Sequence, residues 1–395
     1  MHLPLFTALL FGGSAIASRL YAASYDGEVT ELGFSESGTN SRLTSLSQTA
    51  ECGTSPSWLM QDEDNDILYC LDEGVDLPNG TLTSFKSTSN SSFAKVDQHQ
   101  TISGPVSSAF YTPANAPNRH FFAVAHYSGS AVSTYSVDPK TGHFKLSQTF
   151  HFTISSPGPV PSRQDAPHPH GIFIDPTGNF VLVPDLGADV VRIFYIDPTT
   201  GALEQQQSLE VSPGSGPRHA VFWSPQDANP AKNCSVQTRF YLVTELDNLL
   251  RGYDVTYSKD GRSMFFSQFY EENTYDGETP PDGSKAAEIA LSPDNAHLII
   301  SNRLDNTFGP GKDSLAVFSL LDSAQSHNVF FSGLYPAYGT SPRHFSISPD
   351  GDMLAIALQN NKTVVVSWDE ENGAIGDLLG EVTLGGEVTA VLWDL

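Results

Sequence analysis

Residues 166–201 read APHPHGIFIDPTGNFVLVPDLGADVVRIFYIDPTTG and decide the fold. Three apolar runs, IFI, FVLVP and VVRIFYI, alternate with the polar segments DPTG, DLGAD and DPTTG. Each run has the length of a β-strand and is rich in β-branched and aromatic residues, while the Pro-Thr-Gly segments have the composition of turns. The stretch therefore predicts three antiparallel strands of a meander.

This pattern recurs along the chain, with starts near residues 57, 107, 170, 219, 288 and 344. A strand repeat of about 50 residues is typical of a β-propeller, in which each repeat forms one blade. The two ends of the chain supply a seventh blade. EVTAVLWDL at 387–395 reads as a lone innermost strand, and RLYAASYDGEVTEL at 19–32 reads as its partners. We predict an all-β, seven-bladed β-propeller with four-stranded blades, whose ring is closed by the N- and C-terminal strands so that no sheet edge is left open.

Several motifs in this chain resemble those of a known family. They are HPHGIFIDPTGNFVLVPDLGADVVRIFYIDPTTG at 168–201, GPRHAVFW at 216–223, TEL at 244–246, SNR at 301–303 and SPRHFSISPDG at 341–351. Together they resemble the seven-bladed lactonase family, which includes bacterial 6-phosphogluconolactonase and the fungal carboxy-cis,cis-muconate cyclase. The resemblance begins at about Arg19 and implies one lactonase-like propeller domain over residues 19–395.

The N-terminal segment 1–18 (MHLPLFTALLFGGSAIAS) is apolar from Leu3 to Ala17 and ends in an Ala-Ile-Ala cleavage pattern. It is too short to span a bilayer and predicts a secretory signal peptide. A buried first strand is the alternative, because Leu3 to Leu10 could pair in a sheet, and the usual positive charges before the apolar run are missing. Four glycosylation sequons agree with a secreted, extracellular glycoprotein. They begin at Asn79, Asn90, Asn233 and Asn361.

The three cysteines are Cys52, Cys70 and Cys234. Cys52 lies just before an innermost strand and Cys70 near the end of the next strand, so both approach the same end of one blade. We predict that these two form a disulfide and that Cys234 remains unpaired. Three reduced, buried cysteines are the alternative.

The charge balance excludes some partners. Lys and Arg number 20 and Asp and Glu number 45, which gives a net charge of −25. Such a chain is not expected to bind nucleic acid or an anionic membrane.

Three long connections, at 155–167, 271–287 and 304–313, open on the face where the innermost strands begin. We expect them to wall a pocket over the central channel.

Arginines gather on this same face, although the acidic chain has only 11 of them. Arg218, Arg303 and Arg343 fall where innermost strands start or second strands end. A guanidinium group binds a carboxylate or phosphate with two parallel hydrogen bonds, so we predict an anionic small-molecule ligand. Asp185 and the histidines that follow arginine in the PRH motifs read as scaffold residues. These histidines are His219 and His344.

Metal and serine chemistry have little support in the sequence. His168 and His170 point to one side of the chain and could supply two metal ligands, but no third ligand follows with a convincing spacing. The lactonases that this chain resembles need no metal, and no Gly-x-Ser-x-Gly motif occurs. We predict an enzyme without metal or cofactor.

The resemblance also implies the catalytic residues. His170, Arg218, Glu245 and Arg303 match the His, Arg, Glu and Arg that the muconate cyclase family places in its active site. His170 suits a general base, and Glu245 would be its acid partner if its pKa rises. Arg218 and Arg303, with Arg343, would bind the acid groups of the substrate.

The predicted function is an enzyme that forms or opens a lactone of a carboxylated small molecule, of the muconate or sugar-acid type, by acid–base catalysis. Two alternatives remain at this point. The protein is a non-catalytic extracellular propeller that binds an acidic ligand, or the charged residues form a buried salt-bridge network that ties blades together.

Overall fold

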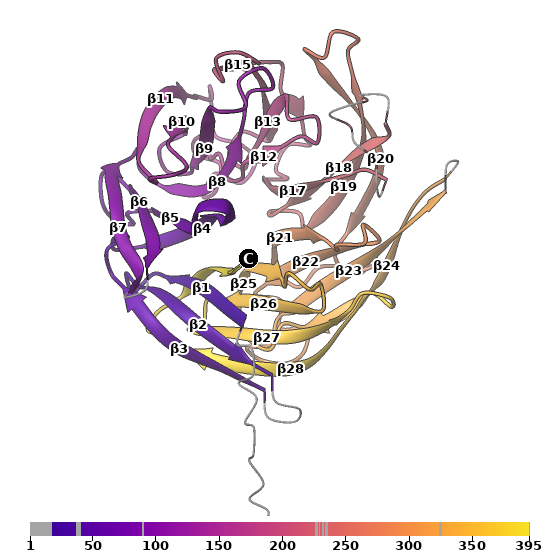
Figure 1. Ribbon diagram of the computed structural model, residues 1–395. Helices are drawn as coiled ribbons and strands as arrows, with labels where there is room; N and C mark the ends of the chain where they lie inside the picture. Colours follow the sequence, from indigo (N-terminus) through magenta and orange to yellow (C-terminus); the bar gives the residue numbers. More distant parts are fainter. Residues whose placement is uncertain are drawn as a thin grey trace, which may run out of the picture.

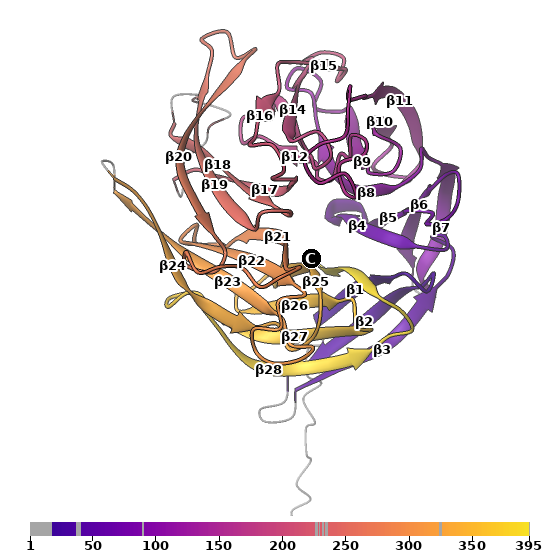
Figure 2. The ribbon, with the colours of Figure 1, turned by 180° about the vertical axis from the view of Figure 1, so that it is seen from behind.

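The computed structural model describes residues 18–36, 41–88, 91–225, 228, 230, 233, 236–323 and 326–394. These residues form seven antiparallel sheets arranged around a common centre (Figure 1). The view from behind shows the same radial arrangement, with one strand of each sheet nearest the centre (Figure 2). The predicted seven-bladed β-propeller is confirmed.

Six blades follow one another along the chain. Blade 1 consists of β4 (Pro56–Asp62), β5 (Ile67–Asp72), β6 (Thr81–Thr88) and β7 (Ser91–Gln100), with the 3-10 helix η1 (Glu63–Asn65) between its first two strands. Blade 2 consists of β8 (Pro105–Tyr111), β9 (His120–His126), β10 (Ala131–Val137) and β11 (Phe144–His151). Blade 3 consists of β12 (Phe173–Ile174), β13 (Phe180–Asp185), β14 (Val190–Ile196), β15 (Leu203–Gln205) and β16 (Leu209–Glu210). Blade 4 consists of β17 (Pro217–Trp223), β18 (Thr238–Thr244), β19 (Leu249–Tyr257) and β20 (Met264–Asn273). Blade 5 consists of β21 (Lys285–Leu291), β22 (His297–Arg303), β23 (Ser314–Ser323) and β24 (Ser326–Pro336). Blade 6 consists of β25 (Pro342–Ile347), β26 (Met353–Leu358), β27 (Lys362–Asp369) and β28 (Ala374–Thr383).

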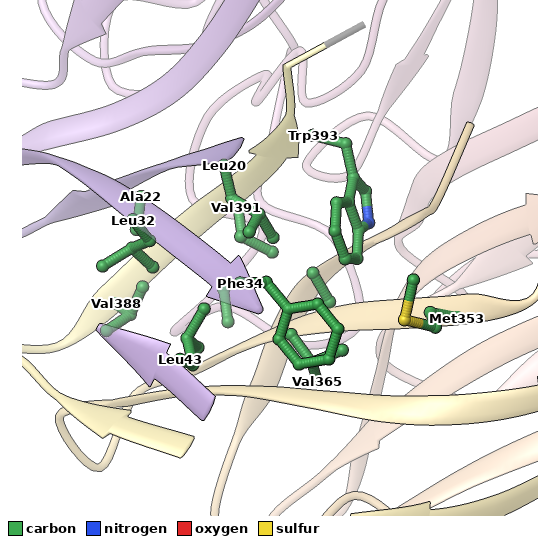
Figure 3. Close-up of a cluster of buried hydrophobic side chains, with 12 residues drawn as sticks. Leu20, Ala22, Leu32, Phe34, Leu43, Met353, Val365, Val388, Val391 and Trp393 are labelled. Carbon is green, nitrogen blue, oxygen red and sulfur yellow. The ribbon is translucent and has the colours of Figure 1, made fainter. Parts of the chain in front are cut away.

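Blade 7 closes the ring with strands from both ends of the chain. The C-terminal strand β29 (Val388–Trp393) pairs with β1 (Ser18–Ser24), which is followed by β2 (Val29–Ser35) and β3 (Arg42–Thr49). Leu20 lies opposite Trp393 in this pairing. Figure 3 shows Trp393 packed between Leu20 of blade 7 and Met353 of blade 6. The predicted closure by the two termini is confirmed.

Blade 3, which contains the stretch that predicted the meander, is the least regular. Its innermost strand β12 is only two residues long, and its outer edge is divided between β15 and β16, which both pair with β14. Pro169 makes an isolated bridge with Asp185 before β12 begins. Because proline has no N–H to donate, the ladder is interrupted there. His170 therefore lies just before the regular strand, at the centre of the ring.

β-bulges turn side chains toward the central axis. In blades 1, 2, 4 and 6 the register of the innermost strand shifts directly after its first residue, which is a proline in each case. A bulge inserts one extra residue and redirects its side chain. The extra residues are Ser57, Val106, Arg218 and Arg343. All four line a small cavity at the centre of the propeller.

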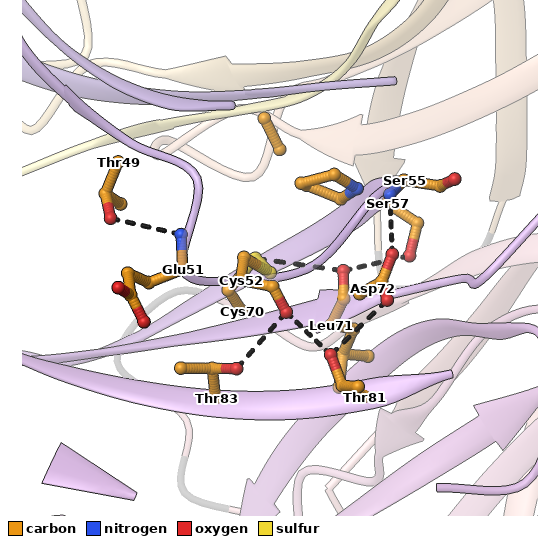
Figure 4. Close-up of a disulfide and its surroundings, with 12 residues drawn as sticks. Thr49, Glu51, Cys52, Ser55, Ser57, Cys70, Leu71, Asp72, Thr81 and Thr83 are labelled. Carbon is orange, nitrogen blue, oxygen red and sulfur yellow. Dashed lines mark hydrogen bonds between the residues drawn. A yellow bond between two sulfur atoms is a disulfide. The ribbon is translucent and has the colours of Figure 1, made fainter. Parts of the chain in front are cut away.

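The predicted disulfide between Cys52 and Cys70 is confirmed, with 5.9 Å between the two Cα atoms (Figure 4). It ties the segment before β4 to β5 in the same blade. The carbonyl oxygen of Cys52 also accepts a hydrogen bond from the Thr81 hydroxyl at 2.6 Å. Cys234 lies outside the described residues.

The features that predicted secretion are only partly within the described residues. All of the predicted signal segment except Ser18 lies outside them, as does Asn90. The other sequon asparagines are exposed on the surface: Asn79, Asn233 and Asn361. No helix in the described part of the chain is long and apolar enough to cross a membrane.

Candidate active site

Glu245 lies at the centre of a cluster of arginines on the face where the innermost strands begin. It follows β18 directly and is only 1% exposed. Its Oε2 atom lies 3.2 Å from Arg218 Nε and 2.8 Å from Arg303 Nη2. Its Oε1 atom accepts a hydrogen bond from Arg163 Nη1. The structure thus brings together three of the predicted site residues and adds a third arginine, from the connection before blade 3.

These arginines fix the ionisation of Glu245. Burial alone would raise the pKa of this carboxyl group, but the charges of Arg303, Arg163 and Arg218 outweigh burial and hold the pKa well below its ordinary value. The prediction that Glu245 acts as an acid partner depended on a raised pKa, and the structure contradicts that condition. Glu245 is a carboxylate that anchors guanidinium groups.

One carboxylate does not satisfy three guanidiniums. Arg218 Nε lies at ion-pair distance from Glu245 but makes no hydrogen bond, and Arg303 Nε has no hydrogen-bond partner in the described structure. Burial, reinforced by the charge of Arg303, lowers the pKa of Arg218 to about 9. The cluster therefore carries excess positive charge and buried N–H groups that can still bind an acceptor.

A second cluster, a chain of imidazoles, lines the central cavity. His170 Nδ1 lies 3.2 Å from His219 Nε2, and His219 Nδ1 lies 2.8 Å from Glu288 Oε1. Glu288 also faces His344 Nε2, at 3.8 Å from Oε2. These residues come from blades 3, 4, 5 and 6 and link them around the axis.

The hydrogen bonds of this chain determine where the protons sit. Burial would raise the pKa of Glu288, but the facing imidazole of His219 outweighs it and keeps the pKa low, so Glu288 accepts a hydrogen bond from His219 Nδ1–H. Burial lowers the pKa of both His170 and His219, so both rings are neutral at neutral pH. His219 Nε2 then accepts a hydrogen bond from His170 Nδ1–H, which leaves the lone pair on His170 Nε2 available as a base.

The central cavity has a volume of about 10 Å³, roughly the space of one water molecule. Its wall includes His170, Arg218 and Arg343. Arg218 belongs to both clusters, because it also contacts Glu245. Arg218 Nη1 donates to the Ala287 carbonyl at 2.6 Å, while its Nε has no hydrogen-bond partner. A neutral base, room for a water and a guanidinium with an unused donor are thus in one place.

Arg343 is brought to the same cavity but has its own carboxylate. Its Nη2 atom lies 3.7 Å from Glu73 Oε2, and its guanidinium lies over the ring of Tyr25. The Tyr25 hydroxyl donates a hydrogen bond to Glu73. Arg343 therefore has a carboxylate of its own, whereas Arg218 and Arg303 share Glu245.

A larger pocket adjoins the Glu245 cluster. Its volume is about 510 Å³, and its wall combines residues 160–163, 246–248 and 280–285. Two of the predicted long connections, 155–167 and 271–287, thus wall a pocket. The third, 304–313, contributes none of its lining residues, so the expectation of three loops around one pocket is wrong in that part.

Comparison with known proteins identifies the family. Residues 19–393 match the family described as "Lactonase, 7-bladed beta-propeller". The chain belongs to this family. Among its relatives, a probable 6-phosphogluconolactonase of Arthroderma benhamiae is 32% identical over 82% of this chain and 76% of its own length. A 6-phosphogluconolactonase of Formosa agariphila is 29% identical over 84% of this chain and 86% of its own.

Solved structures share the fold of this lactonase-family chain. A periplasmic gluconolactonase of Pseudomonas aeruginosa superposes with a TM-score of 0.73 at 23% identity, over 95% of this chain and 99% of that one. A putative 6-phosphogluconolactonase of Bacteroides fragilis superposes with a TM-score of 0.75 at 21% identity, over 98% of this chain and 99% of that one. The predicted family and the prediction of a lactonase-type enzyme are confirmed by the family match.

Neighbouring polar residues of the lactonase propeller have structural roles. Asp185 accepts hydrogen bonds from the backbone of His168 and Ala188 and from Arg192 Nε, at 2.6, 3.1 and 2.8 Å, as expected of a scaffold residue. The ring of His168 contacts the Tyr127 carbonyl and Asp165. No group of three His, Cys, Asp or Glu side chains suited to a metal ion occurs among the residues that the structure describes.

Sequence reasoning missed Arg163 and the positioning role of His219. Arg163 lies in a long connection rather than at a repeated blade position, so the blade pattern could not indicate it. A signal was nevertheless present, because Arg163 is the only arginine in the three long connections. His219 was interpreted as a scaffold residue, and its bonds to His170 and Glu288 do join three blades. The same bonds also fix the tautomer of His170.

Proposed function

We propose that this protein is a secreted hydrolase that opens the lactone ring of a negatively charged sugar acid. The observation that carries the proposal is the excess of buried guanidinium groups around Glu245, next to the neutral base His170. In a chain with a net charge of −25, a buried site with more cations than carboxylates favours an anionic ligand. The names of the relatives, 6-phosphogluconolactonase and gluconolactonase, favour a sugar-acid lactone over a muconolactone.

The geometry supports general-base hydrolysis. His170 Nε2 takes a proton from water while the water oxygen bonds to the lactone carbonyl carbon. The carbonyl oxygen becomes an oxyanion, which the guanidiniums of Arg218 and Arg303 stabilise. The bond between that carbon and the ring oxygen then breaks, and the ring oxygen receives the proton from His170, which gives the open hydroxy acid. Glu288 and His219 are positioning residues, because they hold the proton on His170 Nδ1.

Secretion is part of the proposal. It is supported by the signal-like segment 1–18, by the disulfide between Cys52 and Cys70, and by the exposed sequons. Mass analysis of the protein released by its native host would find an N terminus near Ser18 or Arg19 and attached glycans. An uncleaved chain without glycans would contradict secretion.

The first prediction tests catalysis with the His170→Asn variant. We expect wild-type protein to hydrolyse 6-phosphogluconolactone or gluconolactone above the spontaneous rate and muconolactone poorly. Loss of the base should lower kcat by about 10²–10⁴-fold. The control is His143→Asn, which removes an imidazole that is 63% exposed. Thermal melting shows whether each variant is folded.

Two results would contradict the proposed function. Folded His170→Asn protein with unchanged turnover would exclude His170 as the base. Wild-type protein that binds gluconate or 6-phosphogluconate but accelerates no lactone opening would be a binding protein, the second candidate function.

A further inference from the structure

Tyr127 is a polar residue beside the candidate base that the hydrolysis described above does not use. It directly follows β9, as Glu245 directly follows β18, so both residues lie on the face where the second strands end. The residue is half-buried. Its ring lies edge-to-face with the ring of His170, with 5.7 Å between the ring centroids and 83° between the planes. The phenol is therefore next to the group that moves the proton.

Contacts on several sides fix the position of this phenol. Its ring stacks on the ring of His168, with 4.2 Å between the centroids and 13° between the planes. His168 Nδ1 also donates a hydrogen bond to the Tyr127 carbonyl oxygen at 2.9 Å, and the Tyr127 N–H donates to the Gly104 carbonyl oxygen at 2.6 Å. Because the backbone and the ring are both held, the hydroxyl has a defined place at the site.

The hydroxyl of Tyr127 also has a hydrogen to donate. Arg163 Nε and Nη2 donate hydrogen bonds to the phenol oxygen at 3.3 and 3.2 Å. A phenol carries one O–H donor besides its acceptor lone pairs, and two N–H groups that occupy the lone pairs direct the O–H away from the guanidinium. In the part of the chain that the structure describes, this O–H donates to no acceptor.

The phenol stays protonated at neutral pH and is a strong donor. Burial raises the pKa of Tyr127 and outweighs the charge of Arg163, which lowers the pKa. The hydrogen bonds from Arg163 nevertheless polarise the phenol, because hydrogen bonds in a chain strengthen one another. Such a donor suits a substrate oxygen that gains negative charge during the reaction.

The place of Tyr127 indicates which substrate oxygen it contacts. In the proposed hydrolysis, Arg218 and Arg303 contact the carbonyl oxygen, and His170 gives its proton to the ring oxygen. Tyr127 packs directly against His170, whereas it is linked to the two arginines through Glu245 and its neighbours. A lactone held by these arginines and by His170 therefore presents its ring oxygen to the phenol.

We propose that the Tyr127 hydroxyl donates a hydrogen bond to the ring oxygen of the lactone as the ring opens. The proposal rests on the proposed function and adds a catalytic residue to it. When the bond between the carbonyl carbon and the ring oxygen breaks, its electron pair stays on the ring oxygen. His170 delivers the proton to that oxygen, and Tyr127 keeps its own. The hydrogen bond from Tyr127 strengthens in the transition state, because negative charge develops on its acceptor.

The second prediction tests this contact with Tyr127→Phe, which keeps the ring and removes the hydroxyl. The substrates are gluconolactone and its thiolactone analogue, in which sulfur replaces the ring oxygen. For the oxygen lactone kcat should fall by about 10–100-fold with little change in KM, the size expected of one hydrogen bond to a developing charge. For the thiolactone kcat should fall less than about threefold, because sulfur is a weak acceptor.

The ratio of the two kcat values in one protein does not depend on how much of that protein is folded. The control is Tyr338→Phe, which removes a hydroxyl that donates to the Gly376 carbonyl at 2.8 Å, and it should leave the ratio unchanged. Equal losses on both substrates in Tyr127→Phe would make Tyr127 a structural residue. Unchanged turnover of the oxygen lactone would also exclude the contact.

A binding measurement separates this inference from the proposed function. Calorimetry with gluconate needs no turnover, and the open acid retains the former ring oxygen as a hydroxyl. Tyr127→Phe should weaken gluconate binding by about two- to tenfold, the effect of one neutral hydrogen bond. If binding weakens in this way but wild-type protein opens no lactone, the proposed function fails and the contact remains. If wild-type protein opens lactones but Tyr127→Phe changes neither the substrate ratio nor gluconate binding, the contact is wrong.

Discussion

Two arginine clusters that meet at the C-terminal end of β18 differ in how well their charges are matched. Arg251 in β19 binds Glu271 at 3.0 Å, Asp247 at 2.8 Å, and the hydroxyls of Thr244 and Ser215 at 2.6 and 3.0 Å. A few residues away, one carboxylate, Glu245, serves three guanidiniums. Arg251 and Arg218 are both buried, but the acids beside Arg251 are partly exposed, Asp247 by 28% and Glu271 by 44%, whereas Glu245 is buried.

The difference separates a structural ion pair from a ligand site. Buried polar groups that are fully bonded hold a fold together, whereas buried donors without acceptors cost free energy that a ligand can recover. Arg251 has two carboxylates and two hydroxyls and needs no ligand. The Glu245 cluster also ties blades together, as the salt-bridge alternative supposed, but it retains positive charge for an anion.

The third prediction, which has the largest expected effect, compares Glu245→Gln with Asp247→Asn. Glu245→Gln leaves three neighbouring guanidiniums without their carboxylate and should lower the free energy of unfolding by about 3–5 kcal/mol. Asp247→Asn leaves Glu271 beside Arg251 and should cost about 1 kcal/mol, the usual size of one hydrogen bond. Urea denaturation measures both. Equal losses would remove the distinction between the two clusters.

The parts of the structure that repeat could be predicted from the sequence. Blade spacing placed the strands, and the complementary ends predicted that Trp393 and Leu20 belong to one sheet. Because strand starts and ends meet at one face in every blade, the sequence also indicated that Arg218, Arg303 and Glu245 lie on the same face. The pairing of Cys52 with Cys70 followed from the same rule.

The parts that depend on contacts between non-repeating segments could not be predicted. Arg163 reaches Glu245 from a connection whose path no blade pattern determines. The direction in which the pKa of Glu245 shifts depends on how many cations face this residue. The sequence indicated two of these three arginines, Arg218 and Arg303. The bulge that turns Arg218 toward the axis is a register shift after Pro217, which only the strand pairing reveals.

The fourth prediction concerns the stability of the protein at acidic pH, because burial opposes protonation of the imidazoles at the centre of the ring. Burial lowers the pKa of His344 to about 4, and burial with the charges of nearby arginines lowers that of His170. In the unfolded chain a histidine takes up a proton near pH 6.5. Between pH 6.5 and 4 the unfolded state therefore binds more protons, and stability falls as pH falls.

The slope should reach about 1.4 kcal/mol per pH unit for each imidazole that stays neutral in the folded protein. Glu245 and Glu288, whose pKa values are lowered, keep their contribution until the pH falls below about 4.5. Urea denaturation at pH 8, 7, 6 and 5 measures the slope, and His170→Asn should make it shallower. Constant stability between pH 7 and pH 5 would show that these histidines are not held neutral.

The fifth prediction, with the smallest expected effect, concerns Arg343, which is intermediate between the two clusters. It lines the central cavity with Arg218 but is paired with Glu73 and lies over Tyr25. Arg343→Met should therefore lower kcat/KM for the best lactone by less than about tenfold. Arg218→Met removes a guanidinium whose Nε has no hydrogen-bond partner and should lower it by about 10²–10³-fold, the usual effect of losing one oxyanion donor. Melting temperatures show whether either variant also loses stability, as a structural pair would. Equal losses of kcat/KM in the two folded variants would mean that Arg343 contributes to catalysis as much as Arg218 does. Pairing with Glu73 would then not be enough to make Arg343 a structural residue.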